Sequence, residues 1–166
     1  EIALTFQTVM RFYNRFGDRV SILHSRLSQG ERYNQFLRAK NGELDVMIGP
    51  RSALFTPFSN LGYIIIDEEH ESSYKSETVP RYHARETAFE RARMAGASVI
   101  LGSATPSLES SYRAEKGQLR RFYLSNRAKN ASTLPTCHVA DLREELKNGN
   151  RSILSRKLQE LMEERL

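Results

Sequence analysis

The chain has 166 residues, of which 39% are hydrophobic and 27% are charged, a balance typical of one compact globular domain with its own core. A formal net charge of +5 favours polyanionic partners such as nucleic acid. The single cysteine, Cys137, excludes an internal disulfide and a zinc site made of several cysteines, and no apolar run approaches the roughly 20 residues of a membrane span.

Short apolar segments alternate with amphipathic segments through residues 1–125, which predicts βαβ units around a parallel sheet. Several of the apolar segments contain almost no polar residue, as expected of strands that helices cover on both faces. The expected strands are residues 2–6, 20–24, 45–48, 63–67 and 98–102. The expected helices are residues 8–16, 28–40, 83–95 and 106–114.

Local signals mark the ends of three of these helices. Ser28 and Glu31 have the spacing of a capping box, in which a hydroxyl and a carboxylate bond to the first free N–H groups of a helix. Gly96 ends the helix 83–95. Pro106 suits the first turn of the next helix, where a missing N–H is not needed.

The composition changes after residue 124. Residues 125–135 are polar, basic and without periodicity, which predicts a linker, and a short strand (137–142), a polar turn (147–150) and an amphipathic helix from Ser155 are expected beyond it. The predicted division is therefore residues 1–125 and 126–166. Because the chain starts inside one expected element and ends inside another, we expect an interior piece of a longer protein.

The sharpest feature is the segment Asp67-Glu68-Glu69-His70, which follows the apolar run 63–66. Acids at the carboxyl end of a parallel strand lie at the sheet edge where ligands bind. Nucleotide hydrolysis needs one carboxylate that holds Mg²⁺ through water and a second that orients the attacking water. We assign the first role to Asp67, the second to Glu68 and a relay role to His70. The alternative is that these acids cap a following helix.

A second polar segment, from Gly102 to Pro106, follows the expected strand 98–102. If this strand lies beside the strand 63–67, the hydroxyls of Ser103 and Thr105 can bond to His70 or Glu69. Such bonds would couple hydrolysis to movement of a second lobe. The alternative, compatible with the first, is that Ser103 or Thr105 caps the next helix.

The order D-E-x-H followed by S-A-T resembles motifs II and III of superfamily 2 helicases of the DEAH-like kind. Further segments narrow the resemblance to the replication-restart helicases of that superfamily. They are residues 1–5 (EIALT), 49–55 (GPRSALF), 67–75, 81–85 (RYHAR), 102–109 and 139–143 (VADLR).

The resemblance implies an α/β, RecA-like first motor lobe of the P-loop NTPase type, with ATP and Mg²⁺ as cofactors and Asp67 as the metal residue. It implies 3′→5′ unwinding of stalled or branched replication forks during primosome assembly. The implied partners are DNA, replication-restart proteins and single-strand-binding proteins. A monomer in the bacterial cytoplasm, associated with the nucleoid, is expected, and residues 126–166 would lead toward the second lobe.

The chain contains no G-x-x-x-x-G-K-[ST] loop, so the expected lobe is incomplete. In the family that it resembles, this Walker A strand, loop and helix precede the segment matching Glu1, and a zinc insertion follows the segment matching Leu166. Because the loop's amides and lysine provide most of the grip on the triphosphate, we expect the isolated chain to have negligible ATPase activity.

Cations and aromatic rings interleave in two segments after the acids, a pattern suited to single-stranded DNA. The alternative is that Tyr82 packs beneath the loop while Arg81 and Arg85 pair with acids of the next helix. Polar residues at the ends of other strands could hold backbone phosphates or cap those strands. The candidate DNA-binding residues are Tyr74, Lys75, Arg81, Tyr82, His83, Arg85, Arg51, Ser52, Thr5 and Ser25.

Three functions fit these patterns. The favoured one is the ATPase motor lobe of a replication-restart helicase, which is an enzyme in its full-length form. The second is a non-catalytic nucleic-acid-binding α/β module, against which the pair Asp67 and Glu68 argues. The third is a related branched-DNA translocase that shares the two motifs and lacks the aromatic-basic segment 72–85.

Overall fold

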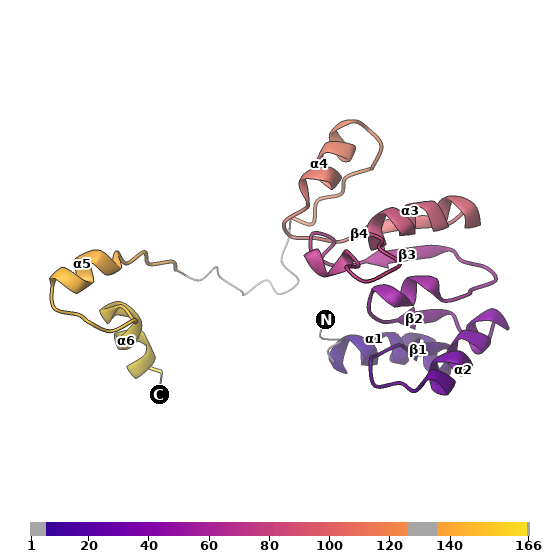
Figure 1. Ribbon diagram of the computed structural model, residues 1–166, viewed down its shortest axis with the longest axis horizontal. Coiled ribbons are helices and arrows are strands. Elements are labelled where there is room, and N and C mark those ends of the chain that lie inside the picture. The colour runs from indigo at the N-terminus through magenta and orange to yellow at the C-terminus, as the bar shows by residue number, and fades with distance from the viewer. Residues whose placement is uncertain (1–5, 126–135, 166) are drawn as a thin grey trace. The chain divides into compact units, whose positions relative to one another are not determined.

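The computed structural model describes residues 6–125 and 136–165. The contacts divide the chain into two compact units, residues 1–121 and 122–166, and each is described by itself. The first unit combines parallel strands with helices, which confirms the predicted α/β class (Figure 1). In the described part of the chain, every helix is too short or too polar to cross a membrane.

The first half of unit 1 is a two-stranded parallel sheet, with helices α1 and α2 beside it (Figure 1). The capping box predicted at Ser28 and Glu31 is confirmed, since each side chain bonds to the other residue's backbone N–H. Ser21 Oγ donates to Gln35 Oε1 at 2.7 Å and joins β1 to α2. The elements are α1 (Phe6–Phe16), η1 (Gly17–Arg19), β1 (Val20–Ile22), α2 (Gln29–Lys40) and β2 (Val46–Ile48).

Four of the five residues of the strand expected at residues 2–6 lie outside the described part of the chain, and the fifth, Phe6, begins α1 instead. The predicted helix 8–16 is therefore present, and it begins two residues earlier than expected.

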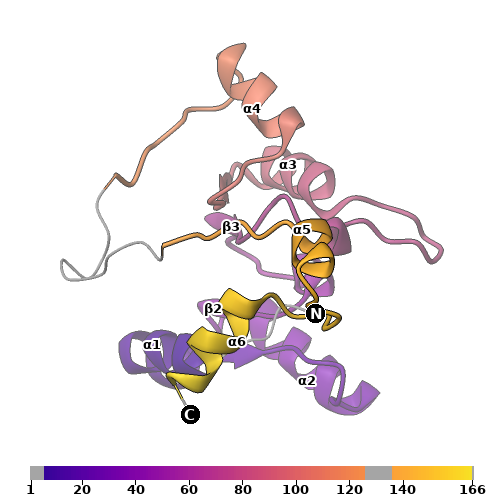
Figure 2. The same cartoon turned by 90° about the vertical axis from the view of Figure 1, so that its left-hand side faces the viewer.

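The second half of unit 1 is another parallel pair, in which Tyr63 lies opposite Ser98 and Ile66 opposite Leu101. Helix α3 packs against both strands of this pair, and in Figure 2 it lies on the β3 side of unit 1, away from α1 and α2. The elements are η2 (Arg51–Phe55), β3 (Tyr63–Ile66), η3 (Ser72–Tyr74), α3 (Ala84–Ala95), β4 (Ser98–Leu101) and α4 (Leu108–Glu115).

The face of α3 that packs on the sheet is a stripe of small residues. Ala84, Ala88 and Ala92 recur at helical spacing and are almost fully buried. The core beneath them includes Ile66 of β3, with Ile64, Val99 and Leu101 packed against it. Gly96 ends the helix with a φ of 66°, the left-handed conformation that glycine adopts without steric cost.

The other face of β3 and β4 is open in this chain, which corrects the expectation of strands covered on both sides. Tyr63 and Ile65 are 67% and 64% exposed, and Ile100 is 47% exposed. The single sheet that was expected is also replaced, within the described residues, by two separate pairs. Along β3, exposed and covered residues alternate, because only the face that carries Ile64 and Ile66 packs against α3.

Helix α4 begins later than predicted. Ser107, not Ser103 or Thr105, is the N-cap, because its Oγ accepts from the N–H of Ser110 at 3.2 Å. Pro106 therefore lies just before the cap rather than inside the first turn.

Unit 2 is a pair of short helices, α5 (Leu142–Lys147) and α6 (Arg156–Glu163). The strand expected at residues 137–142 is wrong: Asp141 caps α5 by accepting from Arg143 N at 2.8 Å. The helix expected from Ser155 is confirmed, with Ser155 as its N-cap. Ten of the residues predicted as linker, 126–135, lie outside the described part, and the assignment of two functional parts stays a prediction.

Candidate active site

The carboxyl ends of β3 and β4 meet at the acidic segment. Gly102 N donates to Ile66 O at 2.8 Å, and Glu69 N donates to Gly102 O at 3.0 Å. A Cβ atom at Gly102 would lie 3.2 Å from Asp67 Oδ1, so glycine leaves room for this carboxylate. Asp67 is exposed at the sheet edge, where ligands of parallel sheets bind.

Glu68 has a φ of 47°, the left-handed region that non-glycine residues rarely adopt. The conformation is held by bonds on both sides, from Glu68 N to Asp67 Oδ1 at 3.0 Å and from Glu71 N to Glu68 O at 2.9 Å. The turn leaves the Glu68 side chain 52% exposed beside Asp67. Backbone strain of this kind costs about 1–3 kcal/mol and clusters at functional sites.

The helix-cap alternative for these acids is wrong, because the short 3-10 helix that follows them, η3, has no side-chain cap. The next α-helix is α3, and its N-cap is His83. The two exposed carboxylates at the strand end are therefore available to a ligand.

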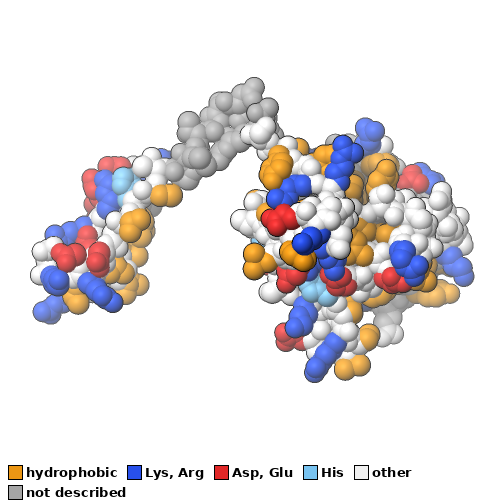
Figure 3. Space-filling model, turned by 90° about the horizontal axis from the view of Figure 1, so that it is seen from above, with side chains coloured by type: hydrophobic (Ala, Val, Ile, Leu, Met, Phe, Trp, Pro, Cys, Tyr) orange, Lys and Arg blue, Asp and Glu red, His pale blue; other side chains and the backbone are white. Residues whose placement is uncertain are grey.

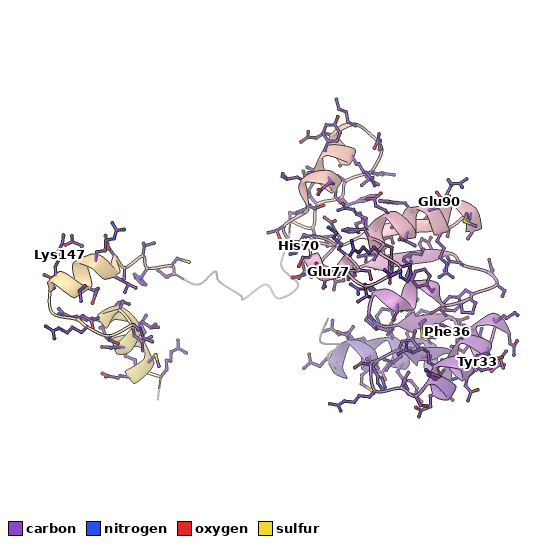
Figure 4. The ribbon with its side chains drawn as sticks, viewed as in Figure 1. Tyr33, Phe36, His70, Glu77, Glu90 and Lys147 are labelled. Carbon is purple, nitrogen blue, oxygen red and sulfur yellow. The ribbon has the colours of Figure 1, made fainter. Side chains whose placement is uncertain are left out.

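His70 makes the contacts that the second motif predicted. His70 Nδ1 and Ser103 Oγ are joined by a hydrogen bond of 2.7 Å, and Nε2 lies 3.4 Å from Thr105 Oγ1. Glu68 Oε2 lies 3.5 Å from Nδ1 (His70 is labelled in Figure 4). The expected bonds are confirmed, and a role in coupling stays a prediction.

Glu69 points into the protein and does not bond to Ser103 or Thr105, contrary to the alternative given for it. The residue is 2% exposed, and its carboxylate accepts from Ser107 N at 2.7 Å, Ser107 Oγ at 3.0 Å and Ser110 Oγ at 2.9 Å. Arg85 Nη1 donates to it at 2.8 Å. Burial acts to raise the pKa of Glu69, but the bonds from Ser107, Arg85 and Ser110 outweigh it and leave the pKa below its usual value.

The structure contradicts the prediction that Tyr74 contacts DNA. The residue is 6% exposed, and its hydroxyl donates to Asp67 O at 2.7 Å. Burial, with the nearby carboxylates of Asp67, Glu71 and Glu68, raises the pKa of Tyr74 to about 12. Tyr74 therefore holds the backbone of the acidic turn from its buried side.

Arg85 is also not available to DNA. It is the second residue of α3, 6% exposed, and its guanidinium bonds to Glu69, Ser107 and Ser110. Its Nε also lies 3.3 Å from Glu86 Oε1, as the alternative for this segment predicted. A buried charge with these partners cannot reach a phosphate without leaving the core.

Residues 75–83 form a loop closed at its base, which we call the basic loop. Lys75 and His83 form an isolated antiparallel bridge, and Ser76 N donates to Tyr82 O at 2.7 Å. Lys75 and Arg81 are exposed on it, so DNA contact by these two stays a prediction. Charged side chains of both signs are interspersed on the face of unit 1 visible in Figure 3.

Tyr82 and His83 have structural partners at the base of the basic loop. The Tyr82 ring packs edge-on against Phe55 at 5.2 Å, and the guanidinium of Arg51 lies 5.9 Å from its centre, which fits the packing alternative. His83 Nδ1 accepts from Arg85 N at 3.3 Å and caps α3. Burial, followed by the charge of Arg85, lowers the pKa of His83, as this neutral cap requires.

The remaining candidates for phosphate contact are scattered. Arg51 Nη1 donates to the backbone oxygens of Ser73 at 2.8 Å and Lys75 at 2.6 Å, so it braces the basic loop. Ser52 is half-buried in η2, and Ser25 is exposed in the turn after β1. Thr5 lies outside the described residues. DNA contact by Ser52 and Ser25 stays a prediction.

Sequence reasoning missed Ser107 and Ser110 as partners of the acidic segment. Both bond to Glu69, and both lie at the start of α4. The available signal was that the two serines lie three residues apart directly after Pro106, which is typical of a helix N-terminus.

The pKa shifts of His83 and Glu69 predict two steps in the stability of unit 1 as the pH falls. Both pKa values are lowered in the folded chain, from 6.5 for His83 and 4.5 for Glu69. Each group therefore contributes stability that is present above its usual pKa and is lost as the pH falls through the lowered one. We expect the urea midpoint to decline first below about pH 6.5 and again below about pH 4.5. In His83→Asn, which retains a capping side chain, the first step should diminish; an unchanged profile would contradict the assignment.

Comparison with known proteins agrees with the fold and with the site at the ends of β3 and β4. The family model described as DEAD/DEAH box helicase matches residues 1–113. The chain therefore belongs to the DEAD/DEAH box helicase family, and its parallel strand pairs with flanking helices are consistent with a partial RecA-like lobe.

Within that family the chain is similar to proteins named replication restart protein PriA. It is 52% identical to that of Bacillus subtilis over 99% of the chain and 48% identical to that of Synechocystis over 96%. It is 47% identical to that of Haemophilus influenzae over 100% of the chain. The matches cover 20%, 20% and 22% of these relatives, so the chain spans about a fifth of their length.

Proposed function

We propose that the chain forms the hydrolytic edge of the first motor lobe of an ATP-dependent 3′→5′ DNA helicase that restarts replication at stalled or branched forks. The observation that carries the proposal is the pair of exposed carboxylates, Asp67 and Glu68, beside the hydrogen-bonded His70 and Ser103. This arrangement lies inside the segment that matches the helicase family. The part of the proposal that concerns replication restart rests on the similarity to the PriA proteins, which are named for it.

The acidic edge fits a magnesium–nucleotide complex. Mg²⁺ is usually held by one or two carboxylates together with waters and phosphate oxygens. The Asp67 carboxylate can play this part, because it is exposed and Gly102 beside it has no side chain to crowd it. Among the described residues there is no group of three or more His, Cys, Asp or Glu side chains placed to hold a metal alone. When bound, the metal would neutralise charge that develops on the phosphates.

Other residues of the chain orient the attacking water and hold the acidic turn in place. Glu68, exposed beside Asp67, accepts a hydrogen bond from the attacking water and orients it. The peptide groups of Gly102 hold this turn to β4. The rest of the proposed protein supplies the triphosphate grip, the zinc-binding segment and the second lobe. We place it in the bacterial cytoplasm, associated with the nucleoid, as a monomer that contacts DNA and replication proteins.

A chimaeric protein tests this function. Residues 1–166 replace the matching fifth of the Bacillus subtilis relative, and ATP hydrolysis is measured with and without branched DNA. We expect the chimaera to hydrolyse ATP faster when DNA is added and to unwind 3′→5′, while the isolated chain shows no turnover above buffer. A folded chimaera that binds DNA without turnover would support the non-catalytic module instead. Turnover by the isolated chain would contradict the need for the missing phosphate loop.

A further inference from the structure

Helix α2 carries an open cavity that is separate from the acidic edge. In Figure 4 its two aromatic residues, Tyr33 and Phe36, lie on α2, well apart from the labelled His70. The cavity has a volume of about 430 Å³, which falls within the roughly 300–1,000 Å³ of small-ligand sites and leaves room for a planar ring. Its lining residues are Leu27, Gln29, Arg32, Tyr33 and Phe36.

The aromatic rings of this cavity are available to a ligand. Tyr33 is 65% exposed, and Phe36 is half-buried. Their spacing of three residues places them on the same side of α2. Within the described part of the chain, neither ring stacks on another aromatic ring. A tyrosine that leaves most of its surface in water offers a face on which a planar group of a ligand can stack.

The charge around the cavity favours an anionic ligand. Among the described residues that line it, Arg32 is the only charged one, and its guanidinium has no hydrogen bond or ion pair with another described residue. The neighbouring acid, Glu31, is occupied by the capping box, because its carboxylate accepts from Ser28 N and from Ser28 Oγ, each at 2.8 Å. Residues 24–40 contain four Lys and Arg side chains and this one acid. The balance suits a polyanion.

A closed turn connects the cavity to the carboxyl end of β1. Leu27, which lines the cavity, donates its N–H to His24 O at 3.3 Å, so the turn between β1 and α2 is compact. Ser25, a predicted phosphate contact, is exposed in the same turn. A nucleic acid strand held at Ser25 therefore has the cavity beside it, two residues further along the protein chain.

We propose that the cavity on α2 binds one unstacked base of single-stranded DNA, with the base on the ring of Tyr33 and an adjoining phosphate on Arg32. Cations combined with exposed aromatic rings bind single strands without sequence preference. An acidic peptide is the competing occupant, and the position of the cavity beside Ser25 favours DNA. The inference rests on the proposed function, which supplies DNA as the partner, and it adds Tyr33 and Arg32 to the DNA contacts predicted from the sequence.

The test uses the same chimaera and measures its Kd for two labelled single strands by fluorescence anisotropy, at several salt concentrations and without ATP. One strand is oligothymidylate. The other has the same length and the same sugar–phosphate backbone but carries no bases. Comparison of the two strands separates a contact with bases from a contact with phosphates, and the thermal midpoint of each preparation shows that it is folded.

Three variants remove or keep the two parts of the contact. Tyr33→Ala should raise the Kd for oligothymidylate about tenfold, the effect of one stacked base, and leave the Kd for the strand without bases unchanged. Tyr33→Phe keeps a ring that can stack and should bind both strands as the native chimaera does. Arg32→Gln should weaken binding of both strands and reduce the slope of log Kd against log salt concentration by about 0.7, as expected for one lost phosphate contact.

The matched control is Tyr112→Ala, which removes a 59% exposed tyrosine of α4 and should change neither Kd. Equal weakening of both strands in Tyr33→Ala would overturn the proposal, because the ring would then not contact a base. A native Kd for both strands in Tyr33→Ala would also overturn it and leave the cavity to a protein partner. A native chimaera that binds oligothymidylate but hydrolyses ATP no faster with DNA would reject the proposed function, while the Kd values would still decide the base contact.

Discussion

Glu68→Gln in the chimaera is expected to lower the rate of DNA-stimulated ATP hydrolysis about a thousandfold, within the range that a positioned acid or base contributes. The substitution keeps the size of the side chain and removes the charge that orients the attacking water. Because the Glu68 side chain is 52% exposed, removal of its charge should not disturb the fold. The measurement is kcat at saturating ATP and DNA, with the thermal midpoint determined on the same samples.

Glu90→Gln is the matched control for this substitution. Glu90 is an exposed acid of α3, paired with Arg93 at 2.6 Å and labelled in Figure 4. Its loss should leave kcat unchanged. If Glu68→Gln retained the native rate, Glu68 would not orient water, and the assignment of the acidic edge as a hydrolytic site would be rejected.

The elements of unit 1 could largely be predicted from local patterns. The four strands found at residues 20–22, 46–48, 63–66 and 98–101 each fall within a predicted strand. Capping chemistry acts over three residues, so Ser28 with Glu31 and the stop at Gly96 were readable from the sequence. The same kind of signal at Asp141 and Glu144, an acid at the N-cap with Glu at the third helical position, was overlooked and produced the wrong strand at residues 137–142.

The exposed part of the site followed from the sequence, and the buried part did not. Asp67, Glu68 and His70 come directly after a strand, so their place at the sheet edge was determined locally. Whether Arg85 faces solvent or the core depends on the phase of α3 and on Glu69, which lies 16 residues earlier in the chain. The alternation of cations and aromatic rings around Tyr74 suggested a DNA-binding surface. That prediction failed for Tyr74 because a sequence pattern does not show which side chains are covered by residues distant in the chain.

The buried pair also predicts a large effect on stability. We expect Arg85→Met to lower the free energy of unfolding of the 166-residue chain by about 3–5 kcal/mol, because Glu69 would remain buried without its cation. The pKa of Glu69 should rise in this variant. Since native Glu69 stabilises the fold above its usual pKa of 4.5, the difference between variant and native chain should shrink as the pH falls toward that value.

A second substitution separates loss of the pair from loss of packing. In Arg85→Met with Glu69→Gln, no buried charge is left unpaired, and the amide can still bond to Ser107 and Ser110, so we expect most of the lost stability to return. Arg93→Met, at a pair whose side chains are 71% and 58% exposed, should cost less than about 1 kcal/mol. Urea denaturation of the three variants and the native chain measures these differences. Equal losses in Arg85→Met and in the double variant would mean that Arg85 stabilises the start of α3 by its aliphatic stem, and that its charge does not hold Glu69 in place.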